Sequence, residues 1–310
     1  MTDTDLLGAL DHGLRETHFD ALGERYQGKV RDTYARGDQL VLVTTDRISA
    51  FDHVFGQTIP FKGQVLNRLA AYFFERTADV APNHVIAVPH GNVTIAHRCT
   101  PIPIEFVVRG HLAGHAWRVY AAGGRTLCGQ RLPDGLRQNA PLPSPLLTPA
   151  TKADEGHDED IALADIVARG LLDARTLGTL TDLALALYAR GAEMARARGL
   201  ILLDTKYEFG RAADGRLLVM DEMHTPDSSR YVYADGFEDR IARDEPQRQL
   251  SKEFLREWLL ASGFRGEGSP PDLPDEVRVA VARRYFETFE ALTGSLFIPD
   301  MQDLSNSITG

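Results

Sequence analysis

A short run of charged residues, Asp204-Thr205-Lys206-Tyr207-Glu208, contains the side-chain types that bind a metal ion together with a phosphate group. Alternate side chains of a β-strand share one face, which predicts that Asp204, Lys206 and Glu208 lie together. Asp221-Glu222 ends the next predicted strand and brings a further carboxylate beside Glu208. Carboxylates near phosphate oxygens are the usual protein ligands of Mg²⁺. The alternative is an exposed salt-bridge ladder, which contributes little to stability, but the apolar flanks of both strands favour a metal site.

A second candidate is the segment Gly23-Glu-Arg-Tyr-Gln-Gly28-Lys29-Val30, which nearly matches the P-loop pattern. Val30 stands where a hydroxyl group would contact Mg²⁺, and the segment leads into a predicted strand instead of a helix. A P-loop is therefore a poor interpretation. A glycine-containing hairpin can still place backbone N–H groups over phosphates, with Lys29 and Arg31 adding positive charge. These residues alone fit a basic surface hairpin equally well.

Three polar segments combine hydroxyl groups with a basic side chain, as the binding of phosphate or carboxylate requires. Each is weak evidence alone, because Ser, Thr and Asp are common in loops. The segments are Thr45–Asp52, Thr148–Asp154 and His224–Arg230.

Periodic patterns indicate the elements that position these residues. Strand formers around the Gly37-Asp38 turn predict a hairpin from residues 28 to 45, and helical spacing predicts an amphipathic helix over Lys62–Thr77. Alternation over residues 101–109 predicts a strand with Ile102, Ile104, Phe106 and Val108 buried and with Glu105 and Arg109 on the opposite face. The Gly- and Pro-rich stretch Gly123–Pro149 is expected to be a functional loop. A hairpin over residues 200–222 and helices over residues 158–169, 177–198, 247–261 and 275–293 complete the prediction.

Composition narrows the class of protein. The 310 residues carry a net charge of −10, which argues against nucleic acid or an anionic membrane as the main partner. Two cysteines, Cys99 and Cys128, lack the spacing of a zinc site and indicate a reducing compartment. With no apolar run of membrane-spanning length and no signal peptide, the expectation is a cytoplasmic protein.

Taken in order, these segments closely resemble the phosphoribosylaminoimidazole-succinocarboxamide synthase (SAICAR synthetase) family. The resemblance spans most of the chain, and its most specific part is Asp-x-Lys-x-Glu-Phe-Gly followed by Asp-Glu-x-His-Thr-Pro-Asp-Ser-Ser-Arg. The resembling segments are Gly28–Asp32, Thr45–Asp52, Ile104–Gly114, Thr148–Asp154, Leu203–Gly210 and Asp221–Arg230.

The resemblance implies an ATP- and Mg²⁺-dependent ligase of purine biosynthesis that joins L-aspartate to the carboxylate of carboxyaminoimidazole ribonucleotide. ATP would convert the carboxylate to an acyl phosphate, and the amine of aspartate would then displace phosphate. Such catalysis depends on positioning and charge neutralisation, which agrees with the lack of a catalytic triad in the sequence.

The resemblance also implies an α+β fold with two lobes and a cleft between them. Residues 1–107 would form a β-rich ATP-binding lobe similar to the N-lobe of protein kinases. Residues 108–310 would form a larger α/β lobe with the metal and substrate hairpin and the C-terminal helices. The resemblance leaves two alternatives for the oligomeric state, a monomer and a homodimer.

By similarity, the loop of Gly28, Lys29, Val30 and Arg31 would cover the nucleotide phosphates, and Glu208 and Asp221 would hold Mg²⁺. Lys206 and Asp204 would be catalytic residues. The residues implied to bind substrate are Asp46, Ser49, Arg109, His115, Lys152, Ser229 and Arg230.

One position departs from the family pattern, because His115 stands where the family normally has serine. A serine hydroxyl there is expected to bind substrate phosphate. Histidine also donates hydrogen bonds, but it is larger, and histidines ordinarily lose their charge near neutral pH. The hypothesis is that substrate binding persists and weakens as the pH rises.

Two other functions are alternatives to the ligase. An inactive, nucleotide-binding sensor or scaffold would not need the acidic residues of a metal site. A kinase-like phosphotransferase would need a catalytic loop with the HRD pattern, which the sequence lacks.

Overall fold

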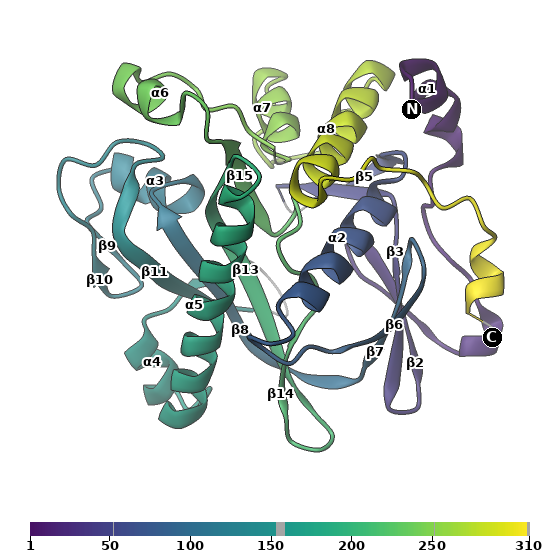
Figure 1. Cartoon of the computed structure of the whole chain (residues 1–310), viewed down its shortest axis with the longest axis horizontal. Coiled ribbons are helices and arrows are strands. Elements are labelled where there is room, and N and C mark those ends of the chain that lie inside the picture. Colours follow the sequence, from purple (N-terminus) through teal and green to yellow (C-terminus); the bar gives the residue numbers. More distant parts are fainter. Residues whose placement is uncertain (52, 153–158, 251, 309–310) are drawn as a thin grey trace.

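Two antiparallel β-sheets lie side by side in the computed structural model, with helix α2 between them (Figure 1). The model describes residues 1–51, 53–152, 159–250 and 252–308. Three predicted positions, Asp52, Asp154 and Asp158, lie outside the described residues.

The first sheet contains the predicted N-terminal hairpin, in which Arg36 pairs with Gln39 at the turn. The predicted amphipathic helix is confirmed as α2 (Lys62–Arg76), whose apolar side chains Val65, Leu66, Leu69 and Phe73 are buried. The strands, in spatial order, are β1 (Arg25–Gln27), β2 (Arg31–Arg36), β3 (Gln39–Thr44), β7 (Val93–His97) and β6 (Val85–His90).

The second sheet is built on two long central strands, β8 (Cys99–His111) and β13 (Leu200–Ala212). The apolar sides of both strands pack against α5 (Ala174–Arg196), as the alternation in residues 101–109 predicts. The other face carries the predicted charged residues. The remaining strands are β12 (Glu159–Asp160), β11 (Pro141–Thr151), β14 (Leu217–Met220) and β15 (Ser229–Tyr233).

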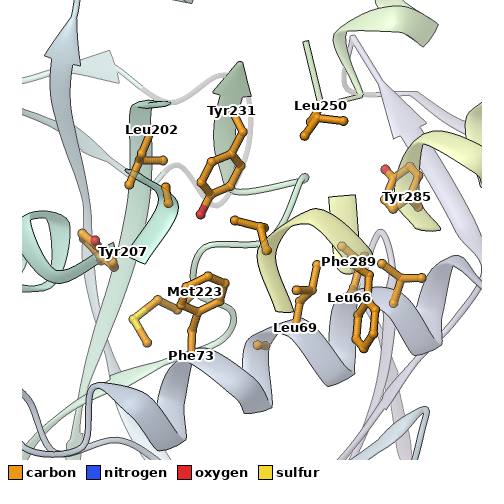
Figure 2. Close-up of a cluster of buried hydrophobic side chains, with 14 of the residues drawn as sticks. Leu66, Leu69, Phe73, Leu202, Tyr207, Met223, Tyr231, Leu250, Tyr285 and Phe289 are labelled. Atoms are coloured by element: carbon orange, nitrogen blue, oxygen red, sulfur yellow. The ribbon is translucent and has the colours of Figure 1, made fainter. Parts of the chain in front are cut away.

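The main hydrophobic core joins α2 and α8 (Asp275–Thr293) to the second sheet, while the buried residues Tyr34, Val41, Val43 and Val93 of the first sheet form a separate cluster with Ile308. Leu69 and Phe73 of α2 meet Tyr207 of β13 and Phe289 of α8 in the main core, and Met223 lies beside Phe73 (Figure 2). Burial of large side chains in the main core stabilises the position of α2 and α8 on the second sheet, at roughly 1.5–3 kcal/mol for each side chain. The core therefore holds β8 and β13, the strands that carry the charged residues, in a fixed position.

Shorter elements complete the chain. Asp300 accepts a backbone hydrogen bond from Gly91 at 3.1 Å, so the segment after α8 returns to the first sheet. Among the described residues, no helix has the length and apolarity needed to span a membrane. These elements are α1 (Asp3–Ala9), β4 (Arg47–Ala50), β5 (His53–Thr58), α3 (Gly114–Ala121), β9 (Thr126–Leu127), β10 (Gln130–Arg131), α4 (Leu163–Ala168), α6 (Phe237–Arg243), α7 (Glu253–Ala261) and the 3₁₀ turns Leu10–His12, Asp20–Leu22 and Leu304–Ser307.

Two expectations differ from the structure. The stretch Gly123–Pro149, expected to be a functional loop, instead contains the β9–β10 hairpin and most of β11. Proline is tolerated in β11 because this strand borders the sheet over most of its length, with β12 pairing only at its end. The expected division at residue 107 falls inside β8, whereas the chain passes from one sheet to the other between β7 and β8.

Candidate functional site

Lys206 is the centre of a cluster of carboxylates on the charged face of β13. Its ammonium group lies 2.7 Å from Glu208 and 2.7 Å from Glu105 of β8. Lys152, at the end of β11, reaches the other oxygen of Glu208 at 2.6 Å. The register explains the grouping, because Glu208 stands directly opposite Glu105. The predicted sharing of one face by Lys206 and Glu208 is confirmed.

The electrostatics of this cluster keep it fully ionised. Burial alone would raise the pKa of Glu208, but Lys206 and Lys152 outweigh it and lower the pKa to about 2. Burial likewise opposes the charge of Lys206, while Glu208, Glu105 and Asp221 raise its pKa above the ordinary value. The cluster therefore presents permanent charges of both signs at neutral pH.

Arg31 brings the first sheet to this cluster. Its guanidinium group forms an ion pair with Asp221 and lies 3.6 Å from Glu222, in the turn after β14. Asp221 has a backbone φ of 67°, a left-handed conformation that few non-glycine residues adopt. Although burial would lower the pKa of Arg31, Asp221, Glu222 and Glu208 raise it. Arg31 thus faces both predicted metal-binding carboxylates, Asp221 and Glu208.

Hydrogen bonds from Arg47 and Thr45 hold the loop that carries Gly28, Lys29 and Val30. Arg47 donates hydrogen bonds to the carbonyl oxygens of Gly28 at 3.1 Å and Lys29 at 3.2 Å. The carbonyl of Val30 accepts from the backbone of Thr45 at 2.9 Å. These bonds hold the loop backbone in place, and successive backbone N–H groups in such a loop can bind an anion.

A second group of charges lies further along the same face of β13. Asp204 accepts hydrogen bonds from Arg109 at 2.8 Å and from Arg230 at 2.9 Å. Arg109 also donates from Nε to the hydroxyl of Thr148 at 2.9 Å. Arg109 lies on the expected face, but that face is buried here, with the side chain 6% exposed. One carboxylate thus orients two guanidinium groups, which is suited to binding an anion.

His115 is the first residue after Gly114 at the start of α3. Its Nε2 lies 2.7 Å from the carboxylate of Asp160 in β12, and both side chains are about 40% exposed, at 41% and 39%. His115, which departs from the family pattern, therefore has an acidic partner in Asp160. In the sequence, Asp160 follows residues 153–158, which lie outside the described residues.

Three predicted substrate-binding residues lie elsewhere. The hydroxyl of Ser229 bonds to Thr205 at 2.8 Å on the opposite face of β13. The carboxylate of Asp46 accepts backbone hydrogen bonds from Gly63 and Leu14, each at 2.8 Å, and so caps the start of α2; burial raises its pKa to about 6. Ser49 pairs with Val54 in the β4–β5 hairpin, which forms a sheet separate from the one that carries the charged face.

Other charged residues were missed by sequence reasoning. Glu105 was expected on the correct face, but its pairing with Lys206 was not predicted. Fully buried Lys62 lies 3.1 Å from Asp227, which also accepts a hydrogen bond from Tyr285. Through these two contacts, Asp227 anchors the segment after β14 to α2 and α8. No local pattern reveals these contacts, because the three residues are far apart in the sequence.

Glu208 and Asp221 are the residues that could hold Mg²⁺. Within the part of the chain that the structure describes, no three His, Cys, Asp or Glu side chains converge to form a complete metal site. Glu208 and Asp221 both act electrostatically on Lys152 and Lys206 and therefore share one neighbourhood. Mg²⁺ is commonly held by one or two carboxylates, with substrate phosphates and water as its other ligands. The two carboxylates fit a metal ion that binds with a nucleotide.

Comparison with known proteins identifies the family to which the sequence is similar. The model of the SAICAR synthetase family matches residues 24–270. The phosphoribosylaminoimidazole-succinocarboxamide synthase of Cytophaga hutchinsonii is 51% identical over 290 residues, covering 92% of this chain and 93% of that protein. The enzyme of the same name from Bacteroides thetaiotaomicron is 48% identical over 299 residues, covering 94% of each chain.

Solved structures show the same fold. The SAICAR synthase of Saccharomyces cerevisiae complexed with SAICAR superimposes with a TM-score of 0.81 at 30% identity, covering 92% of this chain and 99% of that one. A type-2 SAICAR synthetase in complex with ADP gives a TM-score of 0.68 at 23% identity, covering 89% and 100%. The expected mixture of helices and antiparallel strands is confirmed.

Proposed function

The chain belongs to the SAICAR synthetase family, and we propose from this that it joins L-aspartate to carboxyaminoimidazole ribonucleotide, consuming ATP. The products are SAICAR, ADP and phosphate. One observation carries the proposal: two ionised groups share one face of β13, one around Glu208 and one around Asp204. Four residues of strand separate them by about 13 Å. This spacing suits two phosphate-bearing substrates that meet between the groups.

The chemistry requires activation of a carboxylate. An oxygen of the substrate carboxylate attacks the γ-phosphorus of ATP, and the bond to the ADP oxygen breaks. The aspartate amine then attacks the acyl carbon, the amide bond forms, phosphate leaves and the nitrogen loses a proton. Each step moves negative charge between oxygen atoms, so fixed cations lower the barrier.

The residues of the first group neutralise this charge. Lys206 and Lys152 would neutralise the transferred phosphoryl group, and Arg31 would neutralise the nucleotide phosphates together with the loop of Gly28 to Val30. Glu208 and Asp221 would hold Mg²⁺, which supplies further neutralisation of the triphosphate when bound.

The second group binds the ribonucleotide. Arg109 and Arg230 would bind its phosphate or carboxylate, and Asp204 keeps their guanidinium groups oriented at 2.8 and 2.9 Å. In this mechanism Asp204 acts as a positioning residue, because two arginines already occupy its carboxylate.

The inactive sensor is not favoured. Lys206, Glu208, Asp221 and Arg230 are all present, and each takes part in an ion pair on the charged face: Lys206 with Glu208, Asp221 with Arg31, and Arg230 with Asp204. We place the enzyme in the cytoplasm, where its two free cysteines, Cys99 and Cys128, remain reduced.

The testing experiment measures ADP release from the purified protein with ATP and Mg²⁺. Aspartate and carboxyaminoimidazole ribonucleotide are omitted in turn, beside a Glu208→Ala variant. Release that needs both substrates and is lost in the variant supports the ligase. Binding of ATP without turnover would instead support a sensor.

A further inference from the structure

The C-terminal segment, residues 294–308, lies beyond the part of the chain that matches the SAICAR synthetase family model. It leaves α8 and returns to the first sheet (Figure 1). Near its start, Phe297 stacks on Phe286 of α8, with the ring centres 4.6 Å apart. Near its end, buried Ile308 packs in the cluster of the first sheet that contains Val43. Packing therefore holds the segment at both of its ends.

Asp300 lies between these ends and joins α2 to the first sheet. Its backbone N–H donates to the side chain of Gln64 at 2.7 Å, and its carbonyl oxygen accepts from the same side chain at 2.8 Å. One oxygen of its carboxylate accepts the backbone N–H of Gly91, in the turn between β6 and β7, at 3.1 Å, and the other accepts that of Gln302 at 3.1 Å. A Cβ atom at Gly91 would lie 3.0 Å from Gln64 and 3.1 Å from Asp300, so the three residues are closely packed.

The turn between β6 and β7 is connected to the loop that is proposed to cover the nucleotide phosphates. The side chain of Asn92 donates to the carbonyl oxygen of Thr44 at 2.7 Å, and the backbone N–H of Thr44 donates to the carbonyl of Asn92 at 2.8 Å. The next residue, Thr45, donates its backbone N–H to the carbonyl of Val30 at 2.9 Å. Hydrogen bonds between neighbouring segments therefore connect Asp300 to Val30 without a gap.

Gln64 makes a second connection, toward the segment after β14. It is buried in the first turn of α2, close in sequence to Lys62. Lys62 lies 3.1 Å from Asp227, which belongs to the segment that begins at Asp221. Asp300 is therefore tied both to the proposed phosphate-binding loop and to the segment that carries a proposed metal-binding carboxylate.

We propose that Asp300 and Gln64 are positioning residues for the nucleotide, which hold the loop of Gly28 to Val30 and the segment of Asp221 in the positions that ATP and Mg²⁺ require. This inference rests on the proposed function. Both residues act through the backbone that they hold. When the groups that contact a ligand are fixed beforehand, binding loses less conformational entropy and the affinity is higher.

The test is calorimetric titration of ATP with Mg²⁺ into the wild type, Asp300→Ala and Gln64→Leu. Each variant should bind ATP roughly three- to thirtyfold more weakly, the range for residues that are coupled to a site without touching its ligand. Asp300→Asn keeps one acceptor oxygen and should restore part of the affinity. Asp235→Asn, at a side chain that is 96% exposed, removes the same charge and should change nothing.

Two further readouts separate positioning from a general loss of stability. The affinity for carboxyaminoimidazole ribonucleotide should stay unchanged, because its proposed site around Asp204 lies on the second sheet. The double variant Gln64→Leu/Asp300→Ala should bind ATP no more weakly than the weaker single variant, because both substitutions break the same contact. If Asp300→Ala fails to fold, Asp300→Asn carries the same comparison with a smaller expected loss.

Three results would overturn the inference while the wild type binds ATP. They are an unchanged affinity for ATP in the variants, an equal loss of affinity for the ribonucleotide, and additive effects of the two substitutions. Lack of ATP binding by the wild type would instead overturn the proposed function.

Discussion

Arg31 of β2 forms an ion pair with Asp221 after β14, joining the two sheets across 190 residues of sequence. The pair lies at the end of the loop that follows β1 and beside Glu208. It therefore connects the proposed phosphate-binding loop to the proposed metal-binding carboxylates.

Arg31→Gln should raise KM for ATP by tenfold or more, because a charged contact to phosphate contributes about 1.5–3 kcal/mol. Asp221 also loses its partner, so the midpoint of thermal unfolding should fall. Arg36→Gln, at the exposed end of β2, is the control. An ordinary KM for ATP in the Arg31 variant would show that this loop does not bind the nucleotide.

Glu208→Gln should destabilise the protein at neutral pH and much less in acid. The folded-state pKa of Glu208 is about 2, below the ordinary 4.5, because its two lysines outweigh burial. The ionised carboxylate therefore stabilises the fold above about pH 4.5, and this contribution, on the order of 3 kcal/mol, is lost as the pH falls toward 2.

Urea unfolding at pH 7 and pH 3 measures this effect. The difference between wild type and Glu208→Gln should shrink at the lower pH. Glu193→Gln, on the exposed side of α5, should show no difference at either pH. A difference that stayed constant with pH would refute the ionic origin.

His115→Ser should change the affinity for the ribonucleotide. The imidazole that takes the place of the family's serine is larger, and it lies 2.7 Å from the carboxylate of Asp160. Titration of the ribonucleotide into wild type and variant checks this. Asp160→Asn removes the 2.7 Å partner and keeps the imidazole, so it separates the two groups. Identical affinities for wild type and His115→Ser would rule the idea out.

Gly191→Ala in α5 should destabilise the protein and reduce kcat. The new Cβ would lie 2.2 Å from the ring of buried His224, which belongs to the turn that carries Asp221. Overpacking of this kind costs about 1–3 kcal/mol.

Gly178→Ala in the same helix is the matched control. Nothing lies within 4 Å of a Cβ at that position, so alanine should stabilise the helix by up to about 1 kcal/mol. Urea unfolding measures both variants. Equal stability of the two would mean that His224 moves aside freely.

Local periodicity was sufficient for much of the fold and part of the site. Period two in residues 204–208 placed Lys206 and Glu208 on one face, and helical spacing in residues 62–77 predicted α2. These patterns are readable because a strand or helix imposes its repeat on consecutive residues. The proline-rich β11 has no such repeat, and its position at the sheet border became evident only from its pairing with β8.

The sequence by itself determined the family, the charged residues and the faces on which most of them lie. Only the tertiary structure decided their partners: Arg31 with Asp221, Lys206 with Glu105, and His115 with Asp160. It also assigned Asp46 to the start of α2. The physical reason is that ion pairs form between residues that packing brings together, and their separation along the chain carries no local signal.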